Sequence, residues 1–437
     1  MKKVFNILFL LLLCLLNSCS NEEENIFDES SANRIETALK VDKEILMGAP
    51  NGWIMEYYPS KTQAYGGYTV LVSFGENDKV TVASDASGAS GATDPKATAT
   101  SLYGLIQSAG PVLTFNTHNE IFHFFSDPKN EAGLGNVGKG MEGDYEFLIM
   151  EASAEKIRLK GIKTGNSIIM TPMPTNKTWE EYLSELSVAN ENMIFNSFEY
   201  QVNDQNIATV SSSYRTLTFA YTENDLAVSK TFAYIVTPTG YKFYSPINLG
   251  GVEVSELIFH QEGDNCYFTA SNNIKARLNI APISQQLVSG NWYFAYSKLG
   301  SFGKSYWDYA KTNGLDKIGE ELYYGYLGKS KDGEYGFNFA SYDGSSIYTG
   351  VLIYKYTLIK EDQITLNQTS AAGNGAWYFN NAKFNYLINP IGLSGGRTFA
   401  LTTDDKMRPT WIKLTDSSNP DNTITLHKSS IYWPFDN

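Results

Sequence analysis

Short stretches in which apolar and polar residues alternate recur along the chain from residue 53 to residue 427, with Gly and Asn between many of them. In residues 79–84, Val80 and Val82 face one way in an extended backbone and Lys79 and Thr81 face the other. Alternation with period two predicts strands with one buried face, and Gly and Asn predict turns. The pattern therefore predicts a mostly β chain, built of antiparallel meander or barrel domains.

The strands predicted in this way cover residues 53–58, 68–74, 79–84, 102–106, 112–115, 121–125, 145–151, 156–160, 167–170, 215–221, 230–236, 241–244, 252–260, 266–270, 336–340, 351–359, 363–366, 398–402 and 423–427. Two short helices interrupt them. Residues 28–47 carry apolar residues at helical spacing and end at Gly48-Ala49-Pro50. Residues 179–189 follow Thr178, which with Glu181 has the spacing of a capping box.

The N-terminal residues have the pattern of an export signal. Lys2 and Lys3 precede a stretch of roughly 13 apolar-rich residues, which is shorter than the roughly 20 that span a bilayer and typical of a signal peptide over residues 1–18. Leu16-Asn17-Ser18-Cys19 resembles the lipobox of bacterial lipoproteins, whose Cys becomes the first mature residue and carries the acyl chains. The resemblance implies that Cys19 is lipidated and anchors the chain in a membrane. The alternative is an ordinary cleaved signal with an incidental Cys.

Residues 19–25 would then form an acidic tether. Glu22, Glu23 and Glu24 resemble the acidic stretch after the lipidated Cys of Bacteroidetes lipoproteins, which marks export to the outer face of the outer membrane. Clustered like charges also keep a linker extended in water, so a lipoprotein facing the periplasm is the alternative. We expect an outer-membrane protein that faces the cell exterior.

Charge and cysteine content narrow the classes of partner and of stabilising bond. The formal net charge is −13, and loss of Lys2 and Lys3 with the signal would make it more negative, which argues against nucleic acid as a partner. Of three cysteines, Cys14 leaves with the signal and Cys19 is acylated. Cys266 then stands alone, so we expect no internal disulfide.

A length of 437 residues predicts two or three domains. We divide the mature chain into residues 26–280, with a possible further boundary near residue 190, and residues 281–437. The second part opens with "SGNWYFAYS", in which Gly290 and Trp292 stand at the start of a strand. This looks like the first strand of lipocalin-like barrels, where Gly-x-Trp lies at the closed end. The resemblance implies a lipocalin-like C-terminal β-barrel.

Residues 26–280 resemble an uncharacterised family of Bacteroidetes surface lipoproteins. The stretches that carry the resemblance are "RIETALKVDKEILMGAPNGWIMEYYP", "GGYTVLVSFGENDKVTVASD", "GPVLTFNTHNEIFHFFSDP" and "GDYEFLIM". Members of that family are typically encoded near outer-membrane uptake systems of the SusC/SusD type, and the family has no established activity. The resemblance thus implies a SusC/SusD-type transporter as a partner and supplies no catalytic residues.

Several motifs suggest chemistry but favour plainer interpretations. "GLGNVGKG" (133–140) has glycines spaced as in a phosphate-binding loop, yet Gly140 stands where a Ser or Thr must bind magnesium, so we expect an ordinary loop. His118 and His123 would lie on opposite faces of a strand and could not share a metal. We predict no metal site and no cofactor.

Two further pairs of residues are candidates for catalytic groups. His260 and Cys266 are symmetric about Gly263, so a hairpin centred there would place them on one face, where the histidine could activate the thiol. A lone Cys among strand residues is more often a small core residue. Glycoside cleavage needs two carboxylates roughly 5–10 Å apart across a cleft. Asp144 and Glu146 would share a strand face, but any acidic β-rich protein offers such pairs. We assign no catalytic residue.

Aromatic residues beside Gly and Asn, at predicted loop tips, are the remaining candidates for a ligand site. Exposed aromatics often mark binding sites, although core packing or a strand edge is the favoured interpretation for each cluster. The candidates are Tyr65, Tyr68, Trp307, Tyr309, Trp377 and Tyr378.

These patterns together favour a lipid-anchored, non-enzymatic protein that captures a glycan or a peptide for a nutrient-uptake system. A hydrolase of an unrecognised class, or an adhesion or assembly module, is the alternative.

Overall fold

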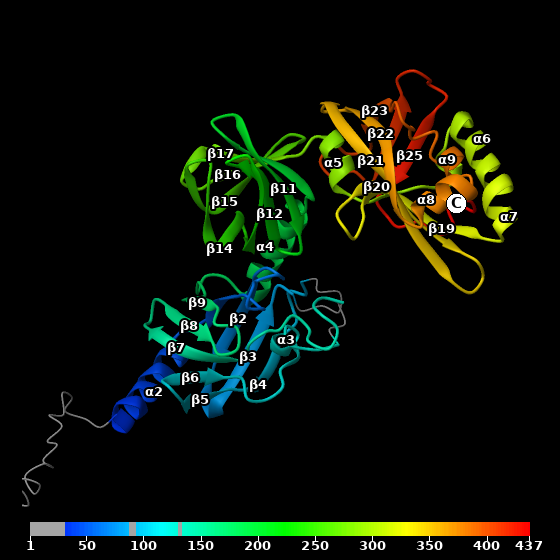
Figure 1. The fold of residues 1–437 in the computed structure, drawn as a ribbon. Helices are drawn as coiled ribbons and strands as arrows, with labels where there is room; N and C mark the ends of the chain where they lie inside the picture. Colours follow the sequence, from blue (N-terminus) through cyan, green and yellow to red (C-terminus); the bar gives the residue numbers. More distant parts are fainter. Residues whose placement is uncertain (1–30, 87–92, 130–132) are drawn as a thin grey trace, which may run out of the picture.

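The computed structural model describes residues 31–86, 93–129 and 133–437, in which three antiparallel β-sheets follow one another along the chain (Figure 1). The predicted signal peptide, Cys19 and the acidic tether lie outside the described residues. The sheets occupy residues 53–172, 197–280 and 292–427. The prediction of a mostly β chain of antiparallel meanders and barrels is confirmed.

The first sheet follows helix α2 (Ser31–Met47), which packs across β2, β5 and β6. Its nine strands are β1 (Trp53–Tyr57), β2 (Tyr68–Phe74), β3 (Lys79–Ser84), β4 (Ala99–Leu102), β5 (Gly104–Gln107), β6 (Pro111–Thr114), β7 (Glu146–Ala152), β8 (Ile157–Gly161) and β9 (Ser167–Pro172). Their order is β4-β3-β2-β1-β9-β8-β7-β6-β5. Since Tyr103 alone separates the two edge strands β4 and β5 in the chain, the sheet curls into a nearly closed barrel.

Helix α4 (Trp179–Asn192) leads to the second sheet, an eight-stranded closed barrel that we call the middle barrel. Its strands are β10 (Ser197–Val202), β11 (Gln205–Ser213), β12 (Thr216–Glu223), β13 (Leu226–Thr237), β14 (Gly240–Leu249), β15 (Val252–Glu262), β16 (Asn265–Ala270) and β17 (Asn273–Ile280).

Every connection between consecutive strands of the middle barrel is a two-residue turn. At Asn203-Asp204, Asn224-Asp225 and Gly250-Gly251 both turn residues have positive φ, the conformation that matches the twist of a tight hairpin and that Asn, Asp and Gly adopt most readily. Neither end of this barrel therefore carries a long loop, and its sides are the surface available for binding.

Helix α5 (Ile283–Ser289) leads to the third sheet, a second closed barrel that we call the C-terminal barrel. Its strands are β18 (Trp292–Tyr293), β19 (Glu321–Lys329), β20 (Tyr335–Tyr342), β21 (Ile347–Lys360), β22 (Gln363–Gly373), β23 (Arg397–Thr403), β24 (Trp411–Asp416) and β25 (Thr423–His427). Helices α6 (Ser301–Ala310), α7 (Asp316–Ile318), α8 (Gly375–Asn381) and α9 (Phe384–Leu387) gather on one side (Figure 1). Large buried side chains such as Phe294, Phe337 and Phe384 fill its interior.

A helix followed by a buried Trp introduces both the first sheet and the C-terminal barrel. Trp53 at the start of β1 donates its indole N–H to the Leu46 carbonyl of α2 at 2.9 Å. Trp292 at the start of β18 donates in the same way to the Gln286 carbonyl of α5 at 3.2 Å. In each case the indole N–H donates to a carbonyl near the end of the preceding helix, and the Gln286 carbonyl also accepts the Gly290 N–H at 3.1 Å.

The sequence predicts some elements closely and misses others. β3 has the predicted bounds, and the capping box at α4 is formed in both directions by Thr178 and Glu181. The strand predicted over residues 121–125 is wrong, because Asn119 accepts a hydrogen bond from the Phe122 N–H and caps a short helix, α3 (Glu120–His123). Helices α5 to α9 add to the two helices that the sequence predicts. Among the described residues, no helix is both long enough and apolar enough to cross a membrane.

Candidate ligand-binding cleft

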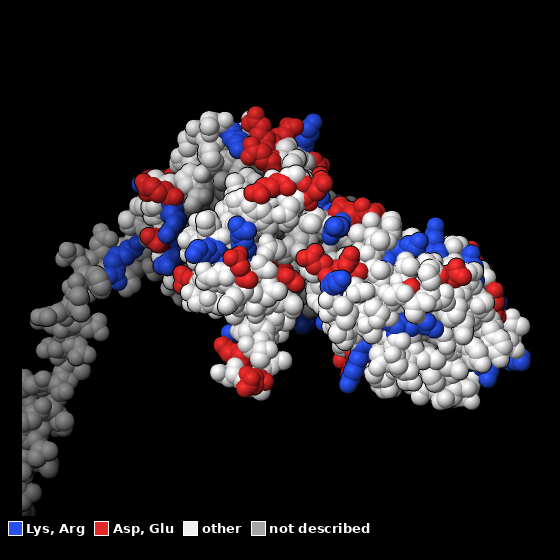
Figure 2. Space-filling view, turned by 90° about the horizontal axis from the view of Figure 1, so that it is seen from above, with Lys and Arg blue, Asp and Glu red and all other residues white. Residues whose placement is uncertain are grey.

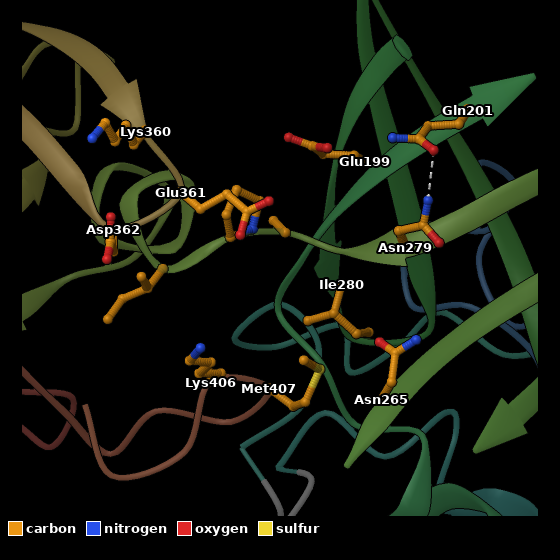
Figure 3. Close-up of a pocket in the computed structure, with 13 residues that line it drawn as sticks. Glu199, Gln201, Asn265, Asn279, Ile280, Lys360, Glu361, Asp362, Lys406 and Met407 are labelled. Carbon is orange, nitrogen blue, oxygen red and sulfur yellow. Dashed lines mark hydrogen bonds between the residues drawn. The ribbon is translucent and has the colours of Figure 1, made fainter. Parts of the chain in front are cut away.

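A polar cleft of about 630 Å³ lies between the middle and C-terminal barrels (Figure 3). It is lined by Glu199, Gln201, Asn265, Asn279, Ile280, Ala281, Pro282, Ile283, Lys360, Glu361, Asp362, Lys406 and Met407. Clefts between domains are common binding sites for small ligands.

The outer face of the middle barrel forms one wall. Along β10, Phe198, Tyr200 and Val202 point into the barrel, so the alternate residues Glu199 and Gln201 point out of it. Glu199 is paired in register with Asn279 of the neighbouring strand β17. This pairing sets a carboxylate beside an amide.

Hydrogen bonds fix the orientation of the Gln201 amide in this wall. The Asn279 side chain donates to the Gln201 Oε1 at 2.8 Å, as Figure 3 shows, and the Gln201 Nε2 donates to Asn206 at 2.6 Å. The wall thus presents its polar groups in an ordered arrangement.

The opposite wall is the tight turn between β21 and β22. Glu361 and Asp362 are its two central residues, since Lys360 and Gln363 are paired in register. The Glu361 carbonyl accepts a hydrogen bond from the Ser284 N–H at 2.9 Å, which ties the turn to helix α5. The side chains of Glu199 and Glu361 point toward one another across the cleft (Figure 3).

The loop between β23 and β24 brings Lys406 and Met407 to the cleft. Asp405 accepts hydrogen bonds from the N–H groups of Met407 at 2.7 Å and Arg408 at 3.1 Å, and the Lys406 carbonyl accepts one from Gln286 at 2.8 Å. Such hydrogen bonds between side chains and backbone hold the loop in one conformation.

Arg408 ties the same loop to the middle barrel. Its guanidinium donates to the carbonyls of Asn192 and Ile194, the latter at 3.3 Å, and lies 4.6 Å from the centre of the Phe195 ring. The two walls are therefore joined both through the linker at residues 280–283 and through Arg408.

The electrostatics of the cleft are mixed. Burial raises the pKa of the Glu199 carboxyl, an effect opposed by its hydrogen bond with Asn206 and reinforced by the negative charge of Glu361. Lys360 and Lys406 stand nearby as hydrogen-bond donors. Carboxylates, amides and ammonium groups at one site suit a ligand rich in hydroxyl or amide groups.

The predicted aromatic candidates do not line this cleft, and three of the six are buried. Trp307 is 1% exposed and packs against Phe294 and Phe435, with ring centres 5.8 and 5.2 Å away. Tyr378 and Tyr68 are 2% and 4% exposed. The expectation that Trp307 and Tyr378 lie at loop tips is wrong, because the Gly and Asn residues beside them belong to helices α6 and α8 or border them.

The other three aromatic candidates reach the surface. Tyr309 is 41% and Trp377 is 49% exposed, on the outer sides of α6 and α8. Tyr65 is half-buried, and its ring lies 6.1 Å from that of Tyr214. The structure does not bring these residues together into one site.

The proposed His260–Cys266 pair is not formed. The hairpin turns about Gly263 and Asp264 together, so His260 is paired with Tyr267 and Cys266 with Gln261. His260 bonds to Thr269 at 2.8 Å, whereas the buried Cys266 belongs to the core of the middle barrel. A turn of two central residues instead of one shifts the register and separates the two groups onto opposite faces.

His118 and His123 also depart from the expectation. Their ring centres are 5.1 Å apart, because the helix α3 replaces the predicted strand. Burial lowers the pKa of His123, and the nearby His118 adds to this effect. A hydrogen bond with the Asn119 backbone opposes it, but the pKa remains below its usual value. No group of three or more potential metal ligands occurs in the described part of the chain.

Asp144 has a structural environment. It lies before β7 rather than on a strand face with Glu146, which begins that strand. Its carboxylate accepts hydrogen bonds from the Lys163 N–H at 2.6 Å and the Thr164 N–H at 3.0 Å. The described residues of the Gly-rich stretch 133–140 form a loop, closed by an isolated bridge between Asn136 and Gly140.

The cleft residues could not be found by motif search, because β10, β16–β17, the β21–β22 turn and the β23–β24 loop are far apart in the chain. The available signal is local: Glu199 is a polar residue on the outward side of an apolar–polar alternation, and Glu361-Asp362 has the pattern of a turn between two strands.

Comparison with known proteins identifies a family but no activity. Residues 23–261 match the family described as a domain of unknown function, DUF4302. The match covers more than half of the chain, so the chain belongs to this family. It ends inside β15, while the middle barrel closes only with β16 and β17. No curated protein matches the chain.

Proposed function

We propose that this member of the DUF4302 family is a lipid-anchored protein of the outer membrane that captures a glycan or a peptide in the cleft between its two closed barrels. The cleft is the observation that carries the proposal. The protein passes its ligand, unaltered, to an uptake porter of the SusC/SusD type. The resemblance to Bacteroidetes surface lipoproteins implies this partner. The Leu16-Asn17-Ser18-Cys19 motif supports the anchor.

The arrangement of the walls supports binding. Both are tight turns or strand faces whose backbone is held by hydrogen bonds, so little ordering is required when a ligand enters. Carboxylate, amide and ammonium groups from Glu199, Asn279 and Lys360 meet the hydroxyl or amide groups of a ligand, while Ile280 and Met407 contact its apolar parts.

Binding is tested with the purified mature chain in detergent, titrated calorimetrically with panels of oligosaccharides and short peptides. Glu199→Gln and Asn279→Ala should weaken the binding of whichever ligand is found by about tenfold, as loss of one or two hydrogen bonds predicts. Glu223→Gln removes an exposed carboxylate elsewhere on the middle barrel and should have no effect. Equal affinity in all three variants would remove the cleft from consideration.

A hydrolase is the second candidate, because Glu199 and Glu361 face each other and the raised pKa of Glu199 suits a general acid. The same panels, followed by mass spectrometry of the incubated ligands, distinguish the two. Cleaved products that disappear with Glu199→Gln would establish hydrolysis and overturn capture. A chain that binds no panel member but binds host cells through this face would support adhesion.

A further inference from the structure

The C-terminal barrel carries a row of seven aromatic side chains on its outer surface, away from the cleft. We call Tyr293, Tyr323, Tyr324, Tyr326, Tyr342, Tyr432 and Trp433 the aromatic row. Ring centres in the row are 5.2 Å apart between Tyr293 and Tyr326, and 5.9 Å between Tyr326 and Tyr324. The row is therefore continuous at this end, ring beside ring.

The row continues from β19 onto the C-terminal residues. Tyr323 lies 5.8 Å from Tyr324, 5.1 Å from Tyr432 and 5.0 Å from Trp433. Trp433 then lies 5.9 Å from Tyr342 of β20. Rings from four segments of the chain thus form one surface feature.

A β-bulge in β19 creates the row. The register of β19 with β20 shifts between Leu322 and Tyr324, so Tyr323 is an extra residue in the strand. Tyr323 and Tyr324 are consecutive, yet both are partly exposed, and the inward alternation resumes at Gly325. A Cβ atom on Gly325 would lie 2.8 Å from the Phe337 ring, so a larger residue here would have to displace that buried ring. Bulges often re-aim side chains beside functional sites.

The row is supported from beneath and still reaches solvent. Tyr432 is 49% exposed and the other six residues are half-buried. The Trp433 N–H donates to the Tyr323 carbonyl at 2.8 Å, and Trp433 has a φ of 54°, a strained backbone conformation for a bulky residue. Strain of this kind persists only where the surroundings impose it.

The charges around the row define which ligand fits. Burial and neighbouring phenol groups raise the pKa values of Tyr324 and Tyr326, so both remain neutral near pH 7. At one end Trp433 also lines a small pocket of about 90 Å³, whose charged groups are Glu320, Glu321, Asp436 and Lys311. An excess of carboxylates there disfavours an anionic polymer.

We propose that the aromatic row is a second binding site, which takes a neutral polysaccharide chain by stacking sugar rings on Tyr324, Tyr326 and Trp433. Consecutive rings in the row are spaced on the scale of one sugar unit, and each tyrosine adds a hydroxyl that hydrogen-bonds the sugar. The rings follow one another from β18 over β19 to the C-terminal residues, and exposed polar residues (Asn291, Glu321 and Lys329) lie near them in the chain, which suits a linear chain better than the broad face that a protein partner buries. This site does not depend on the cleft.

The test is native gel electrophoresis of the full mature chain in detergent, in gels that contain laminarin, galactomannan, arabinoxylan or pullulan as neutral probes and alginate or chondroitin sulfate as anionic ones. At least one neutral polymer should retard the protein more than either anionic polymer. The double variant Tyr324→Ala/Tyr326→Ala should lose about tenfold or more in affinity, as removal of stacking platforms predicts.

Tyr309→Ala is the matched control, because Tyr309 is an exposed tyrosine of the same barrel that lies against Tyr386 and outside the row. It should bind as the unmodified chain does, and so should Glu223→Gln, which removes an exposed carboxylate of the middle barrel. Tyr432→Ala removes the most exposed ring and guards against a misfolded double variant, which a fall in melting temperature would reveal. The proposal is overturned if no neutral polymer retards the chain, or if the anionic polymers retard it more. It is also overturned if Tyr432→Ala and a folded double variant are retarded as strongly as the unmodified chain.

Discussion

Asp85 and Arg215 form an ion pair, 2.5 Å long, across the junction between the first sheet and the middle barrel. The Asp85 side chain is 1% exposed and that of Arg215 is 12% exposed. The guanidinium also lies 4.4 Å from the centre of the Tyr68 ring and donates to the Gly67 carbonyl at 3.0 Å. A charged pair at this depth links two units that the chain connects only through α4.

Loss of the cation from this pair should destabilise the protein strongly. Arg215→Ala leaves the Asp85 carboxylate buried without its partner, which costs about 3–5 kcal/mol. Calorimetric unfolding measures the loss. Lys43→Ala is the control, because its ion pair with Asp78 is about half exposed and contributes about 0–1 kcal/mol. The double variant Asp85→Leu/Arg215→Met should be more stable than Arg215→Ala; similar losses in all three would contradict the role given to the pair.

The C-terminal barrel should lose stability in acid through Asp416. Burial raises the pKa of this carboxyl, but hydrogen bonds from Asn422, Ser418 and Arg397 outweigh burial and hold the pKa below its usual value. A carboxyl whose pKa is lower when folded stabilises the fold above its unfolded pKa of about 3.9, and this stability is lost as the pH falls through the folded value.

Unfolding followed between pH 7 and pH 2 checks this assignment. Asp416→Asn should unfold about 2 kcal/mol more easily at pH 7, since it weakens charged hydrogen bonds, and its stability should change less below pH 4 than that of the unmodified chain. Parallel pH profiles would show that Asp416 is not the responsible group.

Replacement of two tryptophans of the C-terminal barrel should change its stability by very different amounts. Trp307→Ala empties a fully buried site and should cost about 3–5 kcal/mol in denaturant unfolding. Trp377 is half exposed, so Trp377→Ala should change stability by about 0.5 kcal/mol or less. If the two variants unfold alike, the placement of α6 and α8 is wrong.

The lipid anchor is tested at Cys19. Cys19→Ala should abolish incorporation of labelled palmitate and release the protein from the outer membrane. Replacement of Glu22, Glu23 and Glu24 by Ala should leave acylation intact and reduce antibody labelling of whole cells. Unchanged palmitate labelling of Cys19→Ala would refute the anchor. Unchanged surface labelling of the Glu variant would show that the three glutamates act only as a solvated linker and not as an export signal.

Local chemistry explains which parts of the fold the sequence predicts. Period-two alternation predicts β3 and most of β8, and the Thr178–Glu181 spacing predicts the start of α4, since both depend on nearby residues. Residues 121–125 are too short an apolar run to separate helix from strand, and the cap by Asn119 decides in favour of helix.

Neither surface could be predicted in the same way. Glu199 and Glu361 meet only because two barrels are placed side by side. The aromatic row depends on one extra residue in β19, Tyr323, which alternation alone would assign to the opposite face from Tyr324. Register and barrel closure are set by contacts between distant strands, and a pattern read along one strand does not contain them.

Closure of the middle barrel also governs its solubility. β10 is hydrogen-bonded to β17, so the first and last strands hide each other's edges. A fragment ending at residue 261, where the family match ends, would lack β16 and β17 and expose the backbone of β10 and β15 to pairing with other copies. We expect that fragment to aggregate, as light scattering would record, whereas a chain continued through Ile280 stays monodisperse.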